Sequence, residues 1–329
     1  MKKILLSLVT LFAAATSAFA GDIITNGGFE SWTDGACDGW KSTTSASNCK
    51  IIQSADAHSG NSSVQIPEGT KNNRLGSKEY RLKAGTYTMK AYVKGAGSVS
   101  IGYVPIANYV VLNYVYISEK VPTKADGWTE VTKEFTLDKD TKVNFVLMNA
   151  KKTGVKLVDD FSVTTEDGGL AEEPTAFAAE GEGTLESPYN SVAANKAALE
   201  LESGATATSE VYVKGIVHVI NYTYSAKSLS FLISPDGTDN GAFYCFKVTS
   251  DEDPGLKEGD LVVLSGKLTN FRGTPEFAAG AKIVSITTGI STIAAEANKA
   301  QVIYGLDGRR LTKAVRGVNI INGKKVIVK

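Results

Sequence analysis

Apolar and polar residues alternate with a period of two through much of the first half of the chain. Successive side chains of a β-strand point to opposite faces, so this alternation is typical of strands that bury one face. Turn residues separate the runs, which is the pattern of an antiparallel sandwich. The clearest runs are 87–94, 98–103, 129–136 and 142–148.

The second half has a different organisation. A helix is predicted over Val192–Glu202 and ends at Ser203-Gly204. Short strand-like runs separated by turns follow it, and their size and number are those of a small, partly open barrel such as the OB-fold. These runs are 210–219, 228–234, 242–248, 260–270 and 281–286.

Two further segments complete the predicted organisation. Residues 167–183 have few large apolar side chains and no periodicity, which is typical of a linker. Residues 290–329 contain short apolar runs around Asn322-Gly323, a dipeptide that favours a tight hairpin turn. The predicted fold class is therefore all-β: a jelly-roll sandwich, then a small OB-like β-barrel, then a C-terminal β-hairpin tail.

The N-terminus has the features of a secretory signal peptide over residues 1–20. Lys2 and Lys3 precede an apolar run that is too short to span a membrane, and Ala18-Phe19-Ala20 supplies the small residues of a cleavage site. No cysteine follows that site, so we expect no lipid anchor there. The prediction is a secreted, periplasmic or cell-surface protein without a transmembrane segment.

Charge is balanced overall but unevenly distributed. The formal net charge is zero. Residues 181–289 carry 13 acidic and 8 basic side chains, a net charge of −5, whereas residues 300–329 carry one acid and seven bases, a net charge of +6. Nucleic-acid binding needs Lys and Arg for phosphate contacts, so the acidic barrel region argues against it.

The three cysteines and two histidines indicate structural roles rather than a metal-binding site. Cys37 and Cys49 lie in one loop-like region of an exported chain, and we expect a disulfide between them. Cys245 lies in an apolar strand-like run and is expected to be a buried thiol. His58 and His218 are far apart and have no acidic or thiol cluster beside them, so a zinc site is not expected.

The first domain resembles the jelly-roll carbohydrate-binding modules of the family 4/9 type. The motifs that carry the resemblance span residues 22–165: 26–30 (Asn-Gly-Gly-Phe-Glu), 39–40 (Gly-Trp), 58–64 (His-Ser-Gly-Asn-Ser-Ser-Val), 127–128 (Gly-Trp) and 158–162 (Val-Asp-Asp-Phe-Ser). Many members hold a structural calcium. The resemblance assigns its ligands to Glu30 and Asp160, with main-chain oxygens near Ser59 and residues 26–28. The alternative is that Glu30 and Asp160 are ordinary turn acids.

The same resemblance implies a glycan site in which aromatic rings stack on sugar faces. Tyr114 and Tyr116 would point to the same side of a strand. Trp40 and other aromatic residues could equally belong to the core, and some related jelly rolls act as spacers that bind nothing. The aromatic candidates are Trp32, Trp40, Tyr103, Tyr109, Tyr114 and Tyr116.

The later segments resemble parts of secreted Bacteroidetes proteins. The barrel region is similar to an OB-fold domain of such proteins, on residues 183–189, 211–215, 242–245, 259–268 and 273–276. The tail, with Ile303–Arg310 and 322–329, is similar to short type IX sorting segments, which implies contact with a cell surface or a secretion machinery. The predicted division is a signal peptide (1–20), a jelly-roll domain (21–166), a linker (167–183), an OB-like domain (184–289) and a β tail (290–329).

No catalytic motif stands out. The chain lacks a Gly-x-Ser-x-Gly elbow, a His-Glu-x-x-His pair and a phosphate-binding glycine loop before a helix. We therefore expect a non-catalytic glycan-binding or adhesion protein with a structural calcium and a polysaccharide partner. The alternatives are nucleic-acid binding through the OB-like domain, or a structural or protein-interaction role without a glycan ligand.

Overall fold

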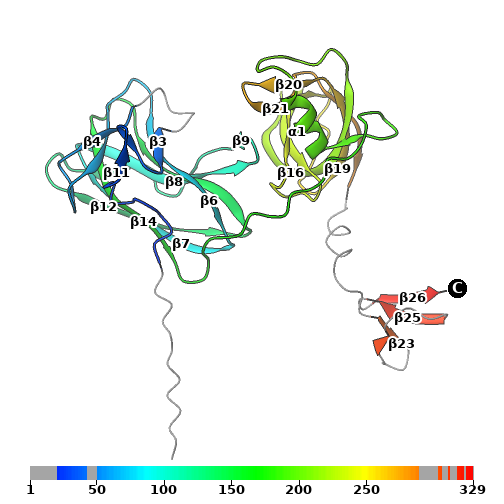
Figure 1. Cartoon of the computed structure of the whole chain (residues 1–329), viewed down its shortest axis with the longest axis horizontal. Coiled ribbons are helices and arrows are strands. Elements are labelled where there is room, and N and C mark those ends of the chain that lie inside the picture. The colour runs from blue at the N-terminus through cyan, green and yellow to red at the C-terminus, as the bar shows by residue number, and fades with distance from the viewer. Residues whose placement is uncertain are drawn as a thin grey trace, which may run out of the picture. The chain divides into compact units, whose positions relative to one another are not determined.

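The computed structural model describes residues 21–42 and 50–288, and the backbone of four short strands between residues 303 and 328 (Figure 1). The predicted signal peptide lies outside the described residues. The chain divides into two compact units, one of residues up to 107 with 111–174, the other of residues 108–110 with 175 onward. Each unit is described by itself.

The first unit is built from two antiparallel sheets. The seven-stranded sheet has the order β10-β8-β13-β6-β3, with β9 and β11 also paired to β8, and the five-stranded sheet has the order β12-β7-β14-β5-β4. The strands of the larger sheet are β3 (Trp40–Ser42), β6 (Asn73–Leu82), β8 (Gly97–Ala107), β9 (Val110–Val111), β10 (Val115–Tyr116), β11 (Val121–Thr123) and β13 (Thr141–Asn149). Those of the smaller sheet are β4 (Ile52–Ser54), β5 (Ser63–Ile66), β7 (Gly85–Lys94), β12 (Thr129–Leu137) and β14 (Lys156–Thr165).

The register of the larger sheet separates its two faces. Ile101, Leu147 and Leu75 lie opposite one another on β8, β13 and β6 and belong to the main core. The next residues along these strands therefore point away from that core, because strand side chains alternate. We call the side that carries Arg74, Val146 and Gly102 the outer face. A small ribbon of β1 (Trp32–Thr33) and β2 (Ala36–Cys37) completes the unit.

The second unit is a small closed β-barrel. Its strands pair in a circuit, β16-β17-β18-β22-β19 and back to β16, closed between β18 and β22 by the parallel pair Thr249 and Lys282. The strands are β15 (Tyr189–Asn190), β16 (Val211–Ser225), β17 (Ser228–Ser234), β18 (Phe243–Thr249), β19 (Leu261–Gly266), β20 (Leu268–Phe271), β21 (Thr274–Phe277) and β22 (Lys282–Thr287). Phe231, Phe243 and Phe277 are fully buried in the barrel core.

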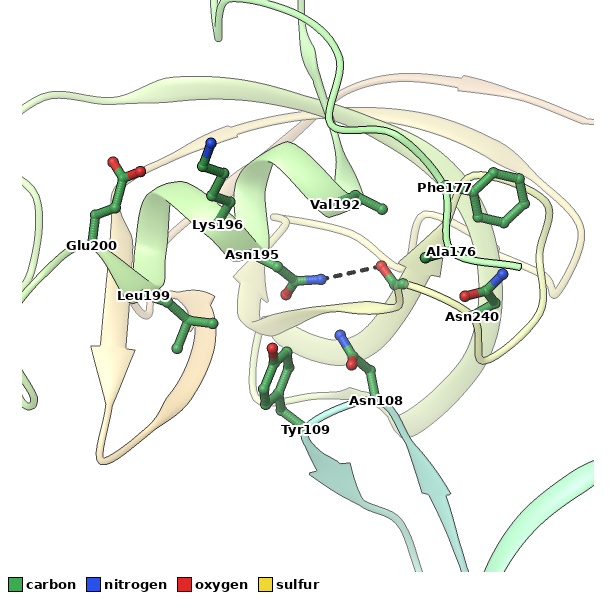
Figure 2. Close-up of a pocket in the computed structure, with 11 residues that line it drawn as sticks. Asn108, Tyr109, Ala176, Phe177, Val192, Asn195, Lys196, Leu199, Glu200 and Asn240 are labelled. Carbon is green, nitrogen blue, oxygen red and sulfur yellow. Dashed lines mark hydrogen bonds between the residues drawn. The ribbon is translucent and has the colours of Figure 1, made fainter. Parts of the chain in front are cut away.

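Helix α1 (Ser191–Leu199) packs on this barrel. The Asn190 side chain caps its first turn by accepting the backbone N–H of Ala193 at 2.8 Å. Ala194 and Ala198 enter the barrel core. Asn195 donates from Nδ2 to the carbonyl oxygens of Gly241, at 3.2 Å, and Ala242, at 3.0 Å; Figure 2 shows the first of these bonds. The helix ends three residues before its predicted end, where the backbone N–H of Leu201 turns to the carbonyl of Ala198.

The C-terminal strands form a separate four-stranded sheet in the order β24-β23-β25-β26. They are β23 (Ile303–Gly305), β24 (Arg310–Leu311), β25 (Gly317–Ile321) and β26 (Lys324–Val328). Ile321 pairs with Lys324 across the hairpin, which confirms the hairpin predicted around Asn322-Gly323. The predicted all-β fold class is confirmed. Within the described residues, none of the helical structure is long and apolar enough to cross a membrane.

The barrel contains one buried carboxyl group with a testable consequence. Glu276 on β21 is 6% exposed, and burial raises its pKa to about 7, from 4.5. Between pH 4.5 and 7 the folded state holds a proton that the unfolded state has lost, so stability falls as pH rises through this window.

We predict that Glu276→Gln stabilises the barrel at pH 8 and has little effect at pH 4. The gain at pH 8 is at most about 3 kcal/mol, because one pKa unit corresponds to about 1.4 kcal/mol. Thermal melting of the full chain at both pH values measures it, with Glu258→Gln, at an exposed position, as the control. Equal melting of the Glu276→Gln variant and the wild type at pH 8 would contradict this account.

Candidate functional site

Two tyrosines lie together on the outer face of the larger sheet. The rings of Tyr114 and Tyr116 are nearly parallel, with an interplanar angle of 9° and centroids 5.9 Å apart, and both side chains are half-buried. This arrangement agrees with the two-residue spacing, which places alternate side chains of an extended segment on one side. We call Tyr114 and Tyr116 the tyrosine pair.

Arg74 on β6 holds the tyrosine pair in place. Its Nε donates a hydrogen bond to the Tyr116 hydroxyl at 2.7 Å, and its guanidinium carbon lies 4.4 Å from the centre of the Tyr114 ring. The second contact is a cation–π interaction, which is stronger when the groups are partly removed from water. Burial raises the pKa of Tyr116, and the hydrogen bond from Arg74 opposes that shift. One arginine therefore fixes both rings.

Gly102 on β8 makes this arrangement possible. Tyr116 pairs with Gly102, and Val115 pairs with Tyr103. A Cβ atom at position 102 would lie 2.1 Å from the carbonyl oxygen of Val115 and 2.8 Å from the Cα of Tyr116. The backbone of β10 thus approaches β8 more closely than any side chain at position 102 would allow.

The other four aromatic candidates lie elsewhere. Trp40 is buried in the core between Phe29 and Phe161, and its indole N–H donates to the carbonyl of Asn26 at 2.9 Å. Trp32 lies on β1 and donates to the carbonyl of Phe29 at 2.6 Å. The Trp40 ring consequently has no free face for a ligand.

Tyr103 and Tyr109 are also separate from the tyrosine pair. Tyr103 packs against the core, with its ring centroid 5.0 Å from that of Phe135, on the face of β8 opposite to the pair. Tyr109 lies in the turn between β8 and β9 and is 47% exposed. The structure therefore brings together two of the six candidates.

Arg74 and Gly102 were not among the residues singled out from the sequence. A single glycine inside the alternating run 98–103 is a signal of close backbone approach, and it marks Gly102 in retrospect. No comparable signal marks Arg74, because its role depends on a contact between β6 and a segment about 40 residues later.

The sandwich architecture and the match to a family model agree. Residues 21–152 match the family described as "Carbohydrate binding domain". The matched segment contains Arg74, Gly102 and the tyrosine pair and ends before β14. It covers less than half of the chain, so the match concerns the first unit, which is a β-sandwich like that of carbohydrate-binding modules.

Solved structures of carbohydrate-binding modules are also similar to this chain, at low sequence identity. One is the xylan-binding domain CBM22-1 of Paenibacillus barcinonensis Xyn10C, with 16% identity and a TM-score of 0.36, covering 44% of this chain and 95% of that one. Another is TmCBM61 in complex with β-1,4-galactotriose, with 19% identity and a TM-score of 0.31, covering 44% and 99%. No curated protein matches the chain.

The three predicted calcium ligands meet at the turn of residues 58–62. Glu30 Oε1 accepts the backbone N–H groups of Asn61, at 2.8 Å, and Ser62, at 3.1 Å, and these donors hold the pKa of Glu30 below its ordinary value. Gly60 suits this turn, because its φ is +62°, and a Cβ there would lie 2.2 Å from Glu30 Oε1 and displace that carboxylate. Asp160 Oδ1 accepts the Ser59 hydroxyl at 2.7 Å.

His58 completes this turn. Its Nδ1 lies 2.6 Å from Asp160 Oδ2, and its ring stacks on Tyr92 with centroids 3.7 Å apart. The carboxylate oxygens at the turn thus contact N–H and O–H donors of the protein. Among the described residues, no group of three or more His, Cys, Asp or Glu side chains is arranged to hold a metal. Calcium at this turn stays a prediction.

The remaining residues to place are the cysteines of the predicted disulfide and thiol, and the aromatic residues of the barrel. Cys37 is buried, and burial raises its pKa to about 12. Cys49 lies outside the described residues, so the predicted disulfide stays a prediction. Cys245 is fully buried, as expected. Of the barrel aromatics, Phe231 is in the core and Tyr222 is 57% exposed.

The close approach at Gly102 yields a prediction. Gly102→Ala should push β10 away from β8, separate the tyrosine pair from Arg74 and destabilise the first unit by about 1–3 kcal/mol, the usual cost of overpacking. Calorimetric melting of the full chain measures the loss. Ser100→Ala, on the same face of the same strand, is the control and should melt like the wild type. Unchanged melting of Gly102→Ala would contradict the proposed packing.

Proposed function

We propose that the protein binds a glycan, without catalysing a reaction, by stacking sugar rings on the tyrosine pair. The observation that carries the proposal is the pair itself: two half-buried rings held nearly parallel on one sheet face by Arg74. Sugar rings have an apolar face that packs on an aromatic ring, and their hydroxyl groups suit polar contacts at its edge. Rings that are already fixed lose little conformational entropy on binding.

Three further observations support this proposal. The matched family model is that of a carbohydrate binding domain, and it includes every residue of this arrangement. Arg74, Gly102 and Tyr116 lie on strands, and Tyr114 lies in the three-residue connection between β9 and β10, which favours a fixed geometry. The barrel region has a net charge of −5, which makes phosphate binding there unfavourable. We place the protein outside the cytoplasm, on the basis of the N-terminal sequence.

We predict that Tyr114→Ala and Tyr116→Ala each weaken glycan binding about tenfold, or about 1.4 kcal/mol, the upper range for an aromatic contact. Affinity electrophoresis and calorimetry of the full chain with soluble xylan, β-glucan and galactan measure this loss. Tyr109→Ala removes an exposed tyrosine outside the pair and should bind like the wild type.

Two results would contradict the proposal. One is the absence of binding across plant, host and microbial glycans. The other is wild-type affinity in both pair variants, which would place the binding site elsewhere. Thermal melting of each variant establishes that the sandwich remains folded.

We also propose a structural calcium ion at the turn of residues 58–62, held by Glu30 and Asp160 with main-chain oxygens near Ser59. The support is that both carboxylates reach this turn from distant segments. Calcium takes six to eight oxygen ligands, so binding would require both carboxylates to exchange some of their present hydrogen bonds for the ion.

Chelation should then lower the melting temperature of the first unit by several degrees, and added calcium should restore it, because a ligand of the folded state stabilises that state. Glu30→Gln should abolish the calcium response, while Glu134→Gln, on an exposed position of β12, should keep it. A melting temperature that is insensitive to chelator and calcium would show that hydrogen bonds alone hold the turn.

A further inference from the structure

Arg74 carries a positive charge that no acidic side chain of the described residues balances. Its contacts are the Tyr116 hydroxyl and the Tyr114 ring, both neutral. The neighbouring strand β3 ends at Ser42, opposite Leu75. Residues 43–49, which follow β3, include no Asp or Glu in the sequence.

The surrounding positions of the outer face are mostly neutral or basic. Met148 lies directly opposite Arg74, and Ser100 lies opposite Met148. In the next row Lys41 lies opposite Gly76 and is exposed. Glu79 lies opposite Asn144, two rows away, and has no ion pair in the described structure. Glu173 also reaches this face, where it pairs with Arg81 and Lys142.

A half-buried guanidinium without an anionic partner is unfavourable, because it loses water without gaining a counter-charge. Guanidinium groups bind carboxylates through two parallel N–H···O bonds. Tyr116 occupies Nε of Arg74 and fixes the side chain, which leaves the terminal Nη groups as donors. The missing partner is thus a planar or tetrahedral anion next to the tyrosine pair.

We infer that the glycan is acidic, and that the carboxylate of a uronic acid residue binds the Nη groups of Arg74 while an adjacent sugar ring stacks on the tyrosine pair. This inference rests on the proposed glycan-binding function and adds the class of glycan. The whole chain has a formal net charge of zero, so a preference for acidic sugars would have to come from a local site.

The test compares oligogalacturonides with the same oligosaccharides whose carboxylates are methyl-esterified, a change that removes the negative charge and adds only a methyl group. A second pair is xylo-oligosaccharide with and without a glucuronic acid branch, and sulfated oligosaccharides show whether any anion suffices. Calorimetry with the full chain should give at least tenfold tighter binding of the uronic acid form in one pair, with a difference that shrinks as salt is added.

Arg74→Gln should abolish this preference. Because Arg74 also holds the tyrosine pair, binding of the neutral form should weaken too, but less than binding of the uronic acid form. Arg74→Lys keeps the charge without the planar fork and should keep only part of the preference. Lys41→Gln is the matched control, since it removes the basic side chain in the row next to Arg74, and it should keep the preference. Thermal melting of each variant separates loss of the site from loss of the fold.

The outcomes are distinguishable. Equal binding of charged and neutral forms by the wild type, or an unchanged preference in Arg74→Gln, overturns the inference and leaves the proposed function intact. A stronger response to sulfate than to carboxylate overturns the assignment to uronic acids. Binding of no glycan by the wild type removes the proposed function and this inference together.

Discussion

The close approach of β10 to β8 at Gly102 is the constraint on which the candidate site depends. Because position 102 has no side chain, the backbone at Val115 and Tyr116 lies directly against β8. That approach sets Tyr116 within hydrogen-bond distance of Arg74 and brings Tyr114 beside it. A small local feature of one strand thus determines the geometry of a site in which residues 114–116 contribute the two rings and β6 contributes Arg74.

The turn of residues 58–62 has a complementary role in the same unit. Glu30 and Asp160 reach it from opposite ends of the sandwich sequence and bind its amide and hydroxyl groups. These contacts join the first and last segments of the unit. Bringing together two chain segments so far apart in sequence costs conformational entropy, which the hydrogen bonds at the turn help to offset. The sandwich that supports the outer face is therefore held together by the hydrogen bonds of this turn as well as by its hydrophobic core.

Much of the architecture could be predicted from the sequence, whereas most of the site could not. Alternation in 87–94 and 142–148 located strands correctly, because half-buried strands impose a period of two on their residues. The same pattern cannot say which face is the core, so Trp40 and Tyr103 appeared as ligand candidates although they pack inward. The contribution of Arg74 depends on long-range pairing, which leaves no local pattern.

The barrel illustrates a second limit. Its five strand-like runs and helix were placed from turns and periodicity, but the hairpin β20–β21 and the burial of Glu276 follow from tertiary packing. A glutamate in a short strand has the same local sequence signal whether it faces water or protein. Its raised pKa depends on the surrounding fold.

Fluorine nuclear magnetic resonance of the full chain labelled with 3-fluorotyrosine tests the central claim most directly. Signals of Tyr114 and Tyr116 can be assigned by single replacement with phenylalanine and followed during titration with a bound glycan. The account predicts that these two signals shift together while that of the buried Tyr87 does not. Shifts confined to other tyrosines, such as Tyr222 of the barrel, would contradict it.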